Sequence, residues 1–256
     1  MLDNRTPEEK SRDRRVGQRA EEVASWYFRL NGFLSLPGFV VHLDQNKARI
    51  GKDGKPRYQR TEADLIGVRF VESKEIIYAF GGEKIMKDDP RLTSICSGSQ
   101  TKQALFILVE VKTGLCEMNG QWTDMRNKNM QRIIRRLGFA VNEDQVEKIS
   151  YDMYRCGKYE DEYYVLQYIC IGSEKNVEIS ERFKDVLQID WFEIGQFLIE
   201  RFLSFPEKTP DGHVHDQWPE FGKRFGKLIA GKQKEGNLAA INPTVIKRFI
   251  KTGEFC

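Results

Sequence analysis

Phe106-Ile107-Leu108-Val109-Glu110-Val111-Lys112 is an apolar run that ends with a carboxylate and an ammonium group two residues apart. Side chains alternate between the two faces of a strand, so this run predicts a buried strand on which Glu110 and Lys112 share a face. A second apolar run, residues 63–68, carries Asp64. Ionised groups beside a core are costly unless they are paired or bind a metal. The two runs therefore predict a site at which Asp64, Glu110 and Lys112 meet.

Composition limits the classes of protein to which the chain can belong. Its 256 residues can bury a full core, and its net charge of +3 is only mildly basic. Nucleic-acid binding must then come from local clusters of basic residues. Five cysteines without CxxC spacing argue against a zinc site and a disulfide framework, and favour a reducing, cytoplasmic location. We expect no signal peptide and no membrane partner, because no apolar run approaches the roughly 20 residues that cross a bilayer.

Periodicity predicts an α/β domain at residues 16–175, between a flexible N-terminal arm (residues 1–15) and a mainly helical C-terminal extension (residues 176–256). The domain begins with a helix over residues 16–31 that stops at Gly32. Strands follow at residues 33–43, at Asp64, at residues 76–80 and at Glu110, with polar loops at residues 44–60 and 81–102. The later predicted elements are helices at residues 124–137 and 143–156, a buried strand at 163–171, a helix at 191–205 with a capping box from Asp190 to Glu193, and a helix at 244–251.

The order helix, strand, strand with Asp, strand with Glu-x-Lys, helix, strand resembles the restriction-endonuclease-like fold of the PD-(D/E)xK nuclease superfamily. This fold has a mixed central sheet flanked by helices. Within the superfamily, residues 16–172 look most like archaeal Holliday-junction resolvases and small bacterial nuclease-like proteins. Ala63 replaces the Pro of the superfamily name, and the long spacing from Asp64 to Glu110 implies an insertion. The matching segments are Gly17-Gln18-Arg19-Ala20-Glu21-Glu22-Val23-Ala24, Glu62-Ala63-Asp64-Leu65-Ile66 and Val109-Glu110-Val111-Lys112-Thr113.

The resemblance implies a Mg²⁺-dependent endonuclease that hydrolyses DNA phosphodiesters in restriction, repair, junction resolution or phage defence. RNA is a variant substrate. Asp64, Glu110 and the carbonyl of Val111 offer the oxygen ligands that Mg²⁺ prefers, and Mn²⁺ is expected to substitute. Lys112 would orient or help deprotonate the attacking water, and the cation would offset charge on the phosphate. The alternative is a catalytically inactive DNA-binding or assembly subunit of the same fold, and a homodimer or larger assembly stays open.

The resemblance also places a glutamate of the first helix near the catalytic residues. Steps of about 100° per residue put Glu21 at the border of the apolar stripe. The same steps put Glu22 on the solvent side beside Arg19, Trp26 and Arg29. Glu21 is therefore the predicted fourth catalytic residue, and an ordinary position on the flank of an amphipathic helix is the alternative.

A solvated face is the default explanation for the charges on the helix after the Glu-x-Lys strand. Solvated faces usually mix signs, however, and this face carries cations without acids, so contacts with the phosphate backbone are the alternative. The cations of this face are Lys128, Arg132, Arg135 and Arg136. A second basic patch is more simply explained as a solvated face. It comprises Lys223, Arg224, Lys227, Lys232 and Lys234, interleaved with Phe221 and Phe225. His213 and His215 lack a third spaced ligand, so no metal site is predicted there.

Overall fold

A mixed six-stranded sheet lies at the centre of the molecule, in the strand order β1-β4-β7-β9-β10 with β8 paired to β9. Its strands are β1 (Leu34–His42), β4 (Arg60–Arg69), β7 (Ala104–Val111), β8 (Lys158–Glu160), β9 (Tyr164–Gly172) and β10 (Leu187–Asp190). This computed structural model describes residues 5–42, 49–50, 56–57, 60–71, 73, 76–79, 82–95, 103–204, 219–237 and 241–255.

The pairing along the order β1-β4-β7-β9-β10 changes from antiparallel to parallel at β7. β1, β4 and β7 are antiparallel neighbours, whereas β7, β9 and β10 are parallel. The chain between β4 and β7 is the insertion that the sequence implies, and it holds the hairpin of β5 (Ile76–Ala79) and β6 (Gly82–Ile85) and the short helix α2 (Pro90–Thr93). A further small hairpin pairs β2 (Arg49–Ile50) with β3 (Pro56–Arg57).

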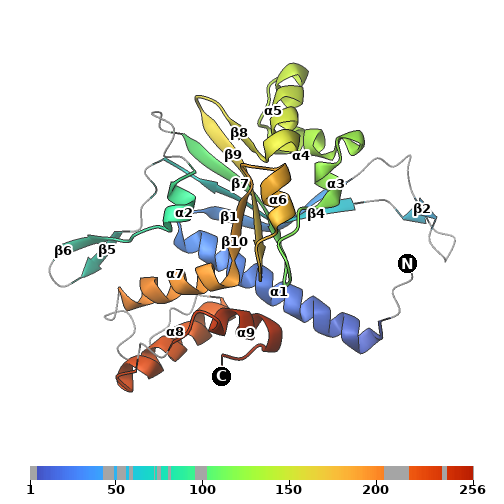
Figure 1. Cartoon of the computed structure of the whole chain (residues 1–256). Helices are drawn as coiled ribbons and strands as arrows, with labels where there is room; N and C mark the ends of the chain where they lie inside the picture. Colours follow the sequence, from blue (N-terminus) through green and yellow to red (C-terminus); the bar gives the residue numbers. More distant parts are fainter. Residues whose placement is uncertain are drawn as a thin grey trace.

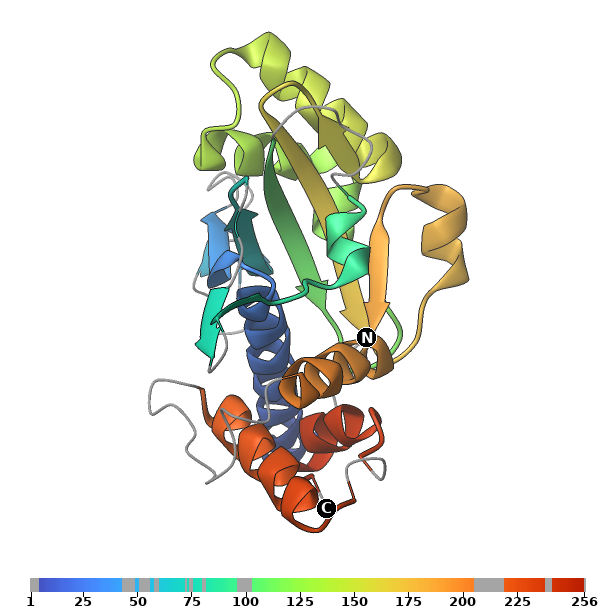
Figure 2. The same cartoon turned by 90° about the vertical axis from the view of Figure 1, so that its left-hand side faces the viewer.

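Helices cover both faces of the sheet, in two layers that Figures 1 and 2 show from different sides. One layer holds α1 (Pro7–Leu30), α7 (Trp191–Leu203), α8 (Glu220–Lys234) and α9 (Val245–Thr252). The other holds α3 (Gly120–Thr123), the 3-10 turn η2 (Met125–Asn127), α4 (Asn129–Leu137), α5 (Glu143–Cys156) and α6 (Val177–Arg182). The structure is therefore an α/β fold with a mixed sheet flanked by helices.

Alternation along β7 divides its buried side chains between the two layers. Ile107 and Val109 belong to the hydrophobic cluster that contains the residues of α1. Leu108 belongs to the opposite cluster, together with Tyr168 of β9. All four side chains are fully buried. A strand covered on both faces needs a nearly continuous apolar run, and this explains the sequence around Glu110 and the run at 163–171.

The first helix begins nine residues earlier than the periodicity predicts, so the expected flexible arm is wrong for residues 7–15. Thr6 forms a capping box with Glu9, and Pro7 occupies the first helical turn. Residues 7–15 are all exposed. The helix therefore starts from these local signals and not from an apolar stripe. The predicted end is confirmed, since α1 stops at Leu30 before Gly32.

The boundary expected at residue 175 is also wrong, because the chain after it is part of the same sheet and the same hydrophobic core. β10 pairs with β9 inside the central sheet, and α7, α8 and α9 share the hydrophobic cluster of α1. The face of α1 predicted to meet solvent is therefore covered. Trp26 is buried against Phe221, and the Glu22 carboxylate accepts a hydrogen bond of 2.9 Å from the Phe221 backbone N–H.

Several local predictions are confirmed. α5 has the predicted bounds with Asn142 and Gly157 as its caps, and α7 begins with the predicted capping box of Asp190 and Glu193. The helix predicted over residues 124–137 is instead interrupted at Lys128, whose φ of 51° is left-handed. The sequence predicted neither β10 nor α6. His213 and His215 lie outside the described residues. No helix in the described ranges is long and apolar enough to span a bilayer.

Candidate active site

Asp64 and Glu110 lie on neighbouring strands despite the long insertion between them. The β4–β7 register pairs Leu65 with Val109, so Asp64 and Glu110 stand opposite each other one step further along. Opposite residues in an antiparallel pair project from the same face. The Asp64 carboxylate also accepts a 2.7 Å hydrogen bond from the Val111 N–H. The predicted juxtaposition is therefore present at the carboxyl end of β7.

The Glu110 side chain is almost fully buried, with 4% of its surface exposed. One carboxylate oxygen, Oε1, is 2.5 Å from the Lys112 Nζ. The other oxygen, Oε2, is buried and has no hydrogen-bond partner within the described part of the chain. A buried carboxylate oxygen without a donor is costly in free energy unless a cation or water satisfies it. This oxygen is therefore a candidate ligand.

The three acids of the site have raised pKa values, which burial explains first. Desolvation and then the charge of Asp64 raise the pKa of Glu110 to about 7, against the lowering effect of Lys112. Burial also raises the pKa of Asp64, although the Val111 N–H and Lys112 oppose the shift. For Glu21, burial and then the charge of Asp64 raise the pKa. Each shift disfavours a negative charge, so a bound cation would return all three towards ionisation.

Lys112 is held as an ammonium ion. Burial lowers its pKa, but the charges of Glu110, Asp64 and Glu117 together outweigh burial, and the net shift is upward. A raised pKa makes Lys112 a poor proton acceptor at neutral pH. In this arrangement the side chain is suited to orienting a water and stabilising negative charge, which is the first of the two roles expected from the sequence.

Asn119 and Tyr168 also line the site, although the sequence did not single them out. Asn119 lies close enough to Glu110 to lower its pKa slightly, and the Asn119 backbone N–H donates to the Tyr168 hydroxyl at 3.1 Å. The Asn119 amide also reaches the Glu62 carbonyl at 3.4 Å. Asn119 is the N-cap of α3, so a capping signal before residue 120 was the only local clue to its position. Tyr168 is hidden within an apolar strand.

The loop after β7 is fixed to the loop after β9. The Ser173 N–H donates to the Gly114 carbonyl at 2.5 Å, and the Ser173 hydroxyl donates to the Thr113 carbonyl at 2.7 Å. The Lys112 N–H continues the ladder by donating to the Ile171 carbonyl at 2.8 Å. These bonds join the two loops at the carboxyl ends of parallel strands and position the backbone that carries Lys112.

We expect Gly172→Ala to disturb this junction. A Cβ at Gly172 would lie 2.7 Å from both the Cys116 backbone nitrogen and the Gly114 carbonyl oxygen, so backbone must move. The expected cost is roughly 1–3 kcal/mol of unfolding free energy, measured by urea denaturation. As a control, Gly114→Ala should cost much less, because a Cβ there meets nothing within 4 Å. Equal costs for both variants would contradict the close packing.

The start of α7 fixes the same loop from the other side. Trp191 is 1% exposed, and its indole N–H donates to the Lys112 carbonyl at 3.2 Å. Trp191 belongs to the region that the sequence assigned to an extension, and only its place in the capping box marked it.

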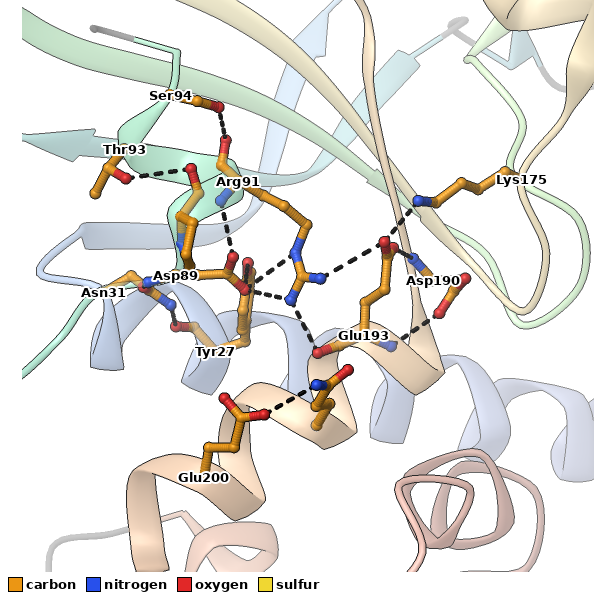
Figure 3. A network of polar contacts seen from close by, with 12 residues as sticks. Tyr27, Asn31, Asp89, Arg91, Thr93, Ser94, Lys175, Asp190, Glu193 and Glu200 are labelled. Carbon is orange, nitrogen blue, oxygen red and sulfur yellow. Dashed lines mark hydrogen bonds and ion pairs between the residues drawn. The ribbon is translucent and has the colours of Figure 1, made fainter. Parts of the chain in front are cut away.

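Figure 3 shows the polar network that holds this end of α7. Asp89 is fully buried and accepts hydrogen bonds from the Tyr27 hydroxyl at 2.8 Å and from the Arg91 guanidinium at 2.6 Å. Arg91 also donates to the Glu193 carbonyl at 3.1 Å, and Lys175 lies 2.6 Å from the Glu193 carboxylate. The network joins α1, α2 and α7, and its ion pairs compensate for the buried charge of Asp89.

The donor set near Glu110 suits a hard cation that retains waters. In a strand the N–H and C=O of a residue point towards the same neighbour, so the Val111 carbonyl lies on the Asp64 side. Two carboxylates and this carbonyl leave room for the waters that Mg²⁺ keeps. Throughout the described ranges, no group of three or more His, Cys, Asp or Glu side chains is placed to hold a metal ion. A cation here would therefore depend on the Asp64 carboxylate, the Val111 carbonyl and the unpaired Oε2 of Glu110.

Of the cations predicted to bind DNA, Lys128, Arg135 and Arg136 are exposed and Arg132 is half-buried. Arg135 forms an ion pair with Glu143 at the start of α5. The sequence of the helix alone indicated a purely basic face. In the structure Glu143 adds an acid to this face. In the second basic patch, Arg224 pairs with Glu254 at 2.5 Å. Phe221 and Phe225, which interrupt that patch in the sequence, are core residues.

Comparison with protein-family models, with curated proteins and with solved structures finds no significant match to the chain. The function must therefore be argued from the site itself.

Proposed function

We propose that the chain is a Mg²⁺-dependent endonuclease of the PD-(D/E)xK type that hydrolyses nucleic-acid phosphodiesters, with DNA as the expected substrate. The observation that carries the proposal is the buried Glu110 carboxylate, opposite Asp64 and paired with Lys112, whose second oxygen has no partner in the described structure. The mixed sheet flanked by helices supports the α/β class to which the restriction-endonuclease-like fold belongs, and that specific fold is part of the proposal.

Each side chain has a distinct part in this proposal. Asp64, Glu110 and the Val111 carbonyl hold the cation, which when bound supplies a more acidic water and offsets charge on the phosphate. Lys112 orients the attacking water and stabilises the developing negative charge. Glu21 lies close enough to both Asp64 and Lys112 for their charges to shift its pKa, so it borders the same space.

The experiment that tests this function is a cleavage assay on labelled single-stranded, duplex and branched DNA and on RNA. We expect cleavage with Mg²⁺ or Mn²⁺ and none with EDTA, because the carboxylates alone supply no Lewis acid. The panel also identifies which nucleic acid is cut. If no substrate is cleaved with either metal, the endonuclease proposal fails.

A non-catalytic nucleic-acid-binding or assembly subunit is the second candidate. It is favoured by the ion pair between Lys112 and Glu110, which compensates for the buried carboxylate without a metal. Such a subunit would bind nucleic acid in the assay above without cutting it. Metal-dependent cleavage that requires Asp64 would exclude this alternative.

The proposal predicts that Lys128, the N-cap of α4, and Arg136, in its last turn, bind phosphates. Changing Lys128 and Arg136 together to Ala should lower the log-log salt slope of DNA binding by nearly two. Each phosphate contact that is lost removes the release of about one counterion from the binding reaction. Fluorescence anisotropy over a salt series measures the slope. Arg248 and Lys251, exposed on α9 in the other layer, provide a charge-matched control pair. An unchanged slope in the Lys128 and Arg136 variant would show that this face is only solvated.

A further inference from the structure

The N-terminal half of α1 projects beyond the body of the protein. Figure 1 shows this segment, in dark blue, running out past the ends of β9 and β10 towards the N-terminus. Every side chain from residue 7 to residue 15 is exposed. A capping box at Thr6 stabilises the segment as a helix where it has no core beneath it. The projection is therefore a regular helix, so the direction in which each of its side chains points is set by its position in the sequence.

One row of α1 side chains runs from the sheet, past the catalytic site and along this arm. Residues spaced alternately by three and four positions lie on one side of a helix. Phe28 and Ala24 of the row are fully buried, and Glu21 is next, where its pKa responds to Asp64 and Lys112. The row then continues along the projecting half of the helix through Gly17, Arg14 and Lys10.

The character of the row changes from apolar to basic at the site. Gly17 leaves open space, since a Cβ there would meet nothing within 4 Å. Arg14 and Lys10 follow at about 10 Å and about 16 Å from Glu21, at 1.5 Å of rise per residue. Both side chains are exposed, so the row carries two positive charges in line with the site.

We propose that Arg14 and Lys10 grip the phosphate backbone of a duplex whose scissile phosphate lies at Asp64 and Glu110. This inference rests on the proposed function and specifies how its substrate is held. Phosphates in one strand of a duplex recur at about 3.4 Å along the axis, so about 10 Å spans roughly three nucleotides. The arm therefore contacts the duplex about three to five nucleotides from the cleaved bond. Gly17 provides the gap through which the backbone passes between Glu21 and Arg14.

Binding of a fluorescein-labelled 30-base-pair duplex in Mg²⁺ tests the proposal, with the full chain carrying Asp64→Asn so that cleavage does not intervene. Adding Lys10→Gln and Arg14→Gln should weaken binding roughly ten-fold at 0.1 M salt and lower the salt slope by nearly two. The matched control adds Arg12→Gln and Arg15→Gln, which remove the same charge from the other side of the same exposed helix. The control pair should change neither quantity appreciably.

The outcomes separate this inference from the proposed function. Equal losses of affinity in the two pairs of variants, or no loss in either pair, would overturn the proposed phosphate contacts of Arg14 and Lys10. This holds even if the protein with Asp64 intact cleaves DNA. Cleavage of DNA by that protein, together with a loss confined to Lys10 and Arg14, supports both proposals. No binding of any duplex by the Asp64→Asn protein and no cleavage by the original chain would overturn both. Circular dichroism at 222 nm confirms that the helix persists in each variant.

Discussion

Asp64→Asn should reduce metal-dependent cleavage at least about 1,000-fold, because the change removes a charged ligand whose effect is greatest in the transition state. The Asn side chain retains an oxygen that can accept the Val111 N–H, which the Asp64 carboxylate now accepts at 2.7 Å. The strand pairing should therefore survive, and the unfolding free energy should change by less than about 1 kcal/mol. Single-turnover cleavage and urea denaturation measure the two effects.

Lys112→Ala separates the role of the ammonium from that of the acids. Its cleavage rate should fall at least about 100-fold through the loss of charge stabilisation. Lys112 also lowers the pKa of Glu110. The residual activity should therefore reach its plateau at higher pH than that of the original chain, since Glu110 must be ionised to bind the cation. Original rates in both Asp64→Asn and Lys112→Ala would place any activity at another site.

Glu110→Gln should stabilise the metal-free protein at alkaline pH. The pKa of Glu110 is about 7 in the folded chain against an ordinary 4.5, mainly because burial disfavours its charge. As pH rises, the unfolded chain loses this proton first, so the unfolding free energy of the original protein falls between about pH 4.5 and pH 7. Gln lacks this ionisation. The stability difference between the variant and the original protein should therefore grow by roughly 3 kcal/mol between pH 4.5 and pH 8.

Urea denaturation in EDTA at the two pH values measures this difference. Glu62→Gln is the matched control, because Glu62 is an exposed acid of the same strand as Asp64. A large pH-dependent difference should therefore be confined to Glu110→Gln. A constant difference for Glu110→Gln would contradict the burial of an ionisable carboxylate at this position.

The parts of the fold set by local chemistry could be predicted from the sequence. Asn142 and Gly157 bound α5, and Asp190 with Glu193 starts α7, because caps act within one helical turn. The apolar run at residues 163–171 predicted a buried strand, which β9 is. The apolar runs that carry Asp64 and Glu110 predicted the meeting of these two acids, because side chains on one face recur with period two.

The remaining features depend on contacts between distant segments. β10 has only four residues and joins the sheet because β9 offers a parallel edge. Trp26 and Glu22 looked solvent-facing because the helix that covers them, α8, lies about 200 residues later in the chain. Asn119 and Trp191 reach the site through a loop and a helix end, and neither has a period that sequence analysis can detect. The local sequence pattern thus predicted the two acids and the lysine of the site, but not the residues that position them.

The binding of Mn²⁺ tests the central claim most directly, because it requires no knowledge of the substrate. Electron paramagnetic resonance of free Mn²⁺, titrated with protein at pH 8, gives the dissociation constant for the original chain and its variants. We expect binding by the original chain, a loss of at least about ten-fold in Asp64→Asn and Glu110→Gln, and little change in Glu178→Gln on the exposed surface of α6. Equal affinity in the original chain, Asp64→Asn and Glu110→Gln would show that these two carboxylates do not bind a cation.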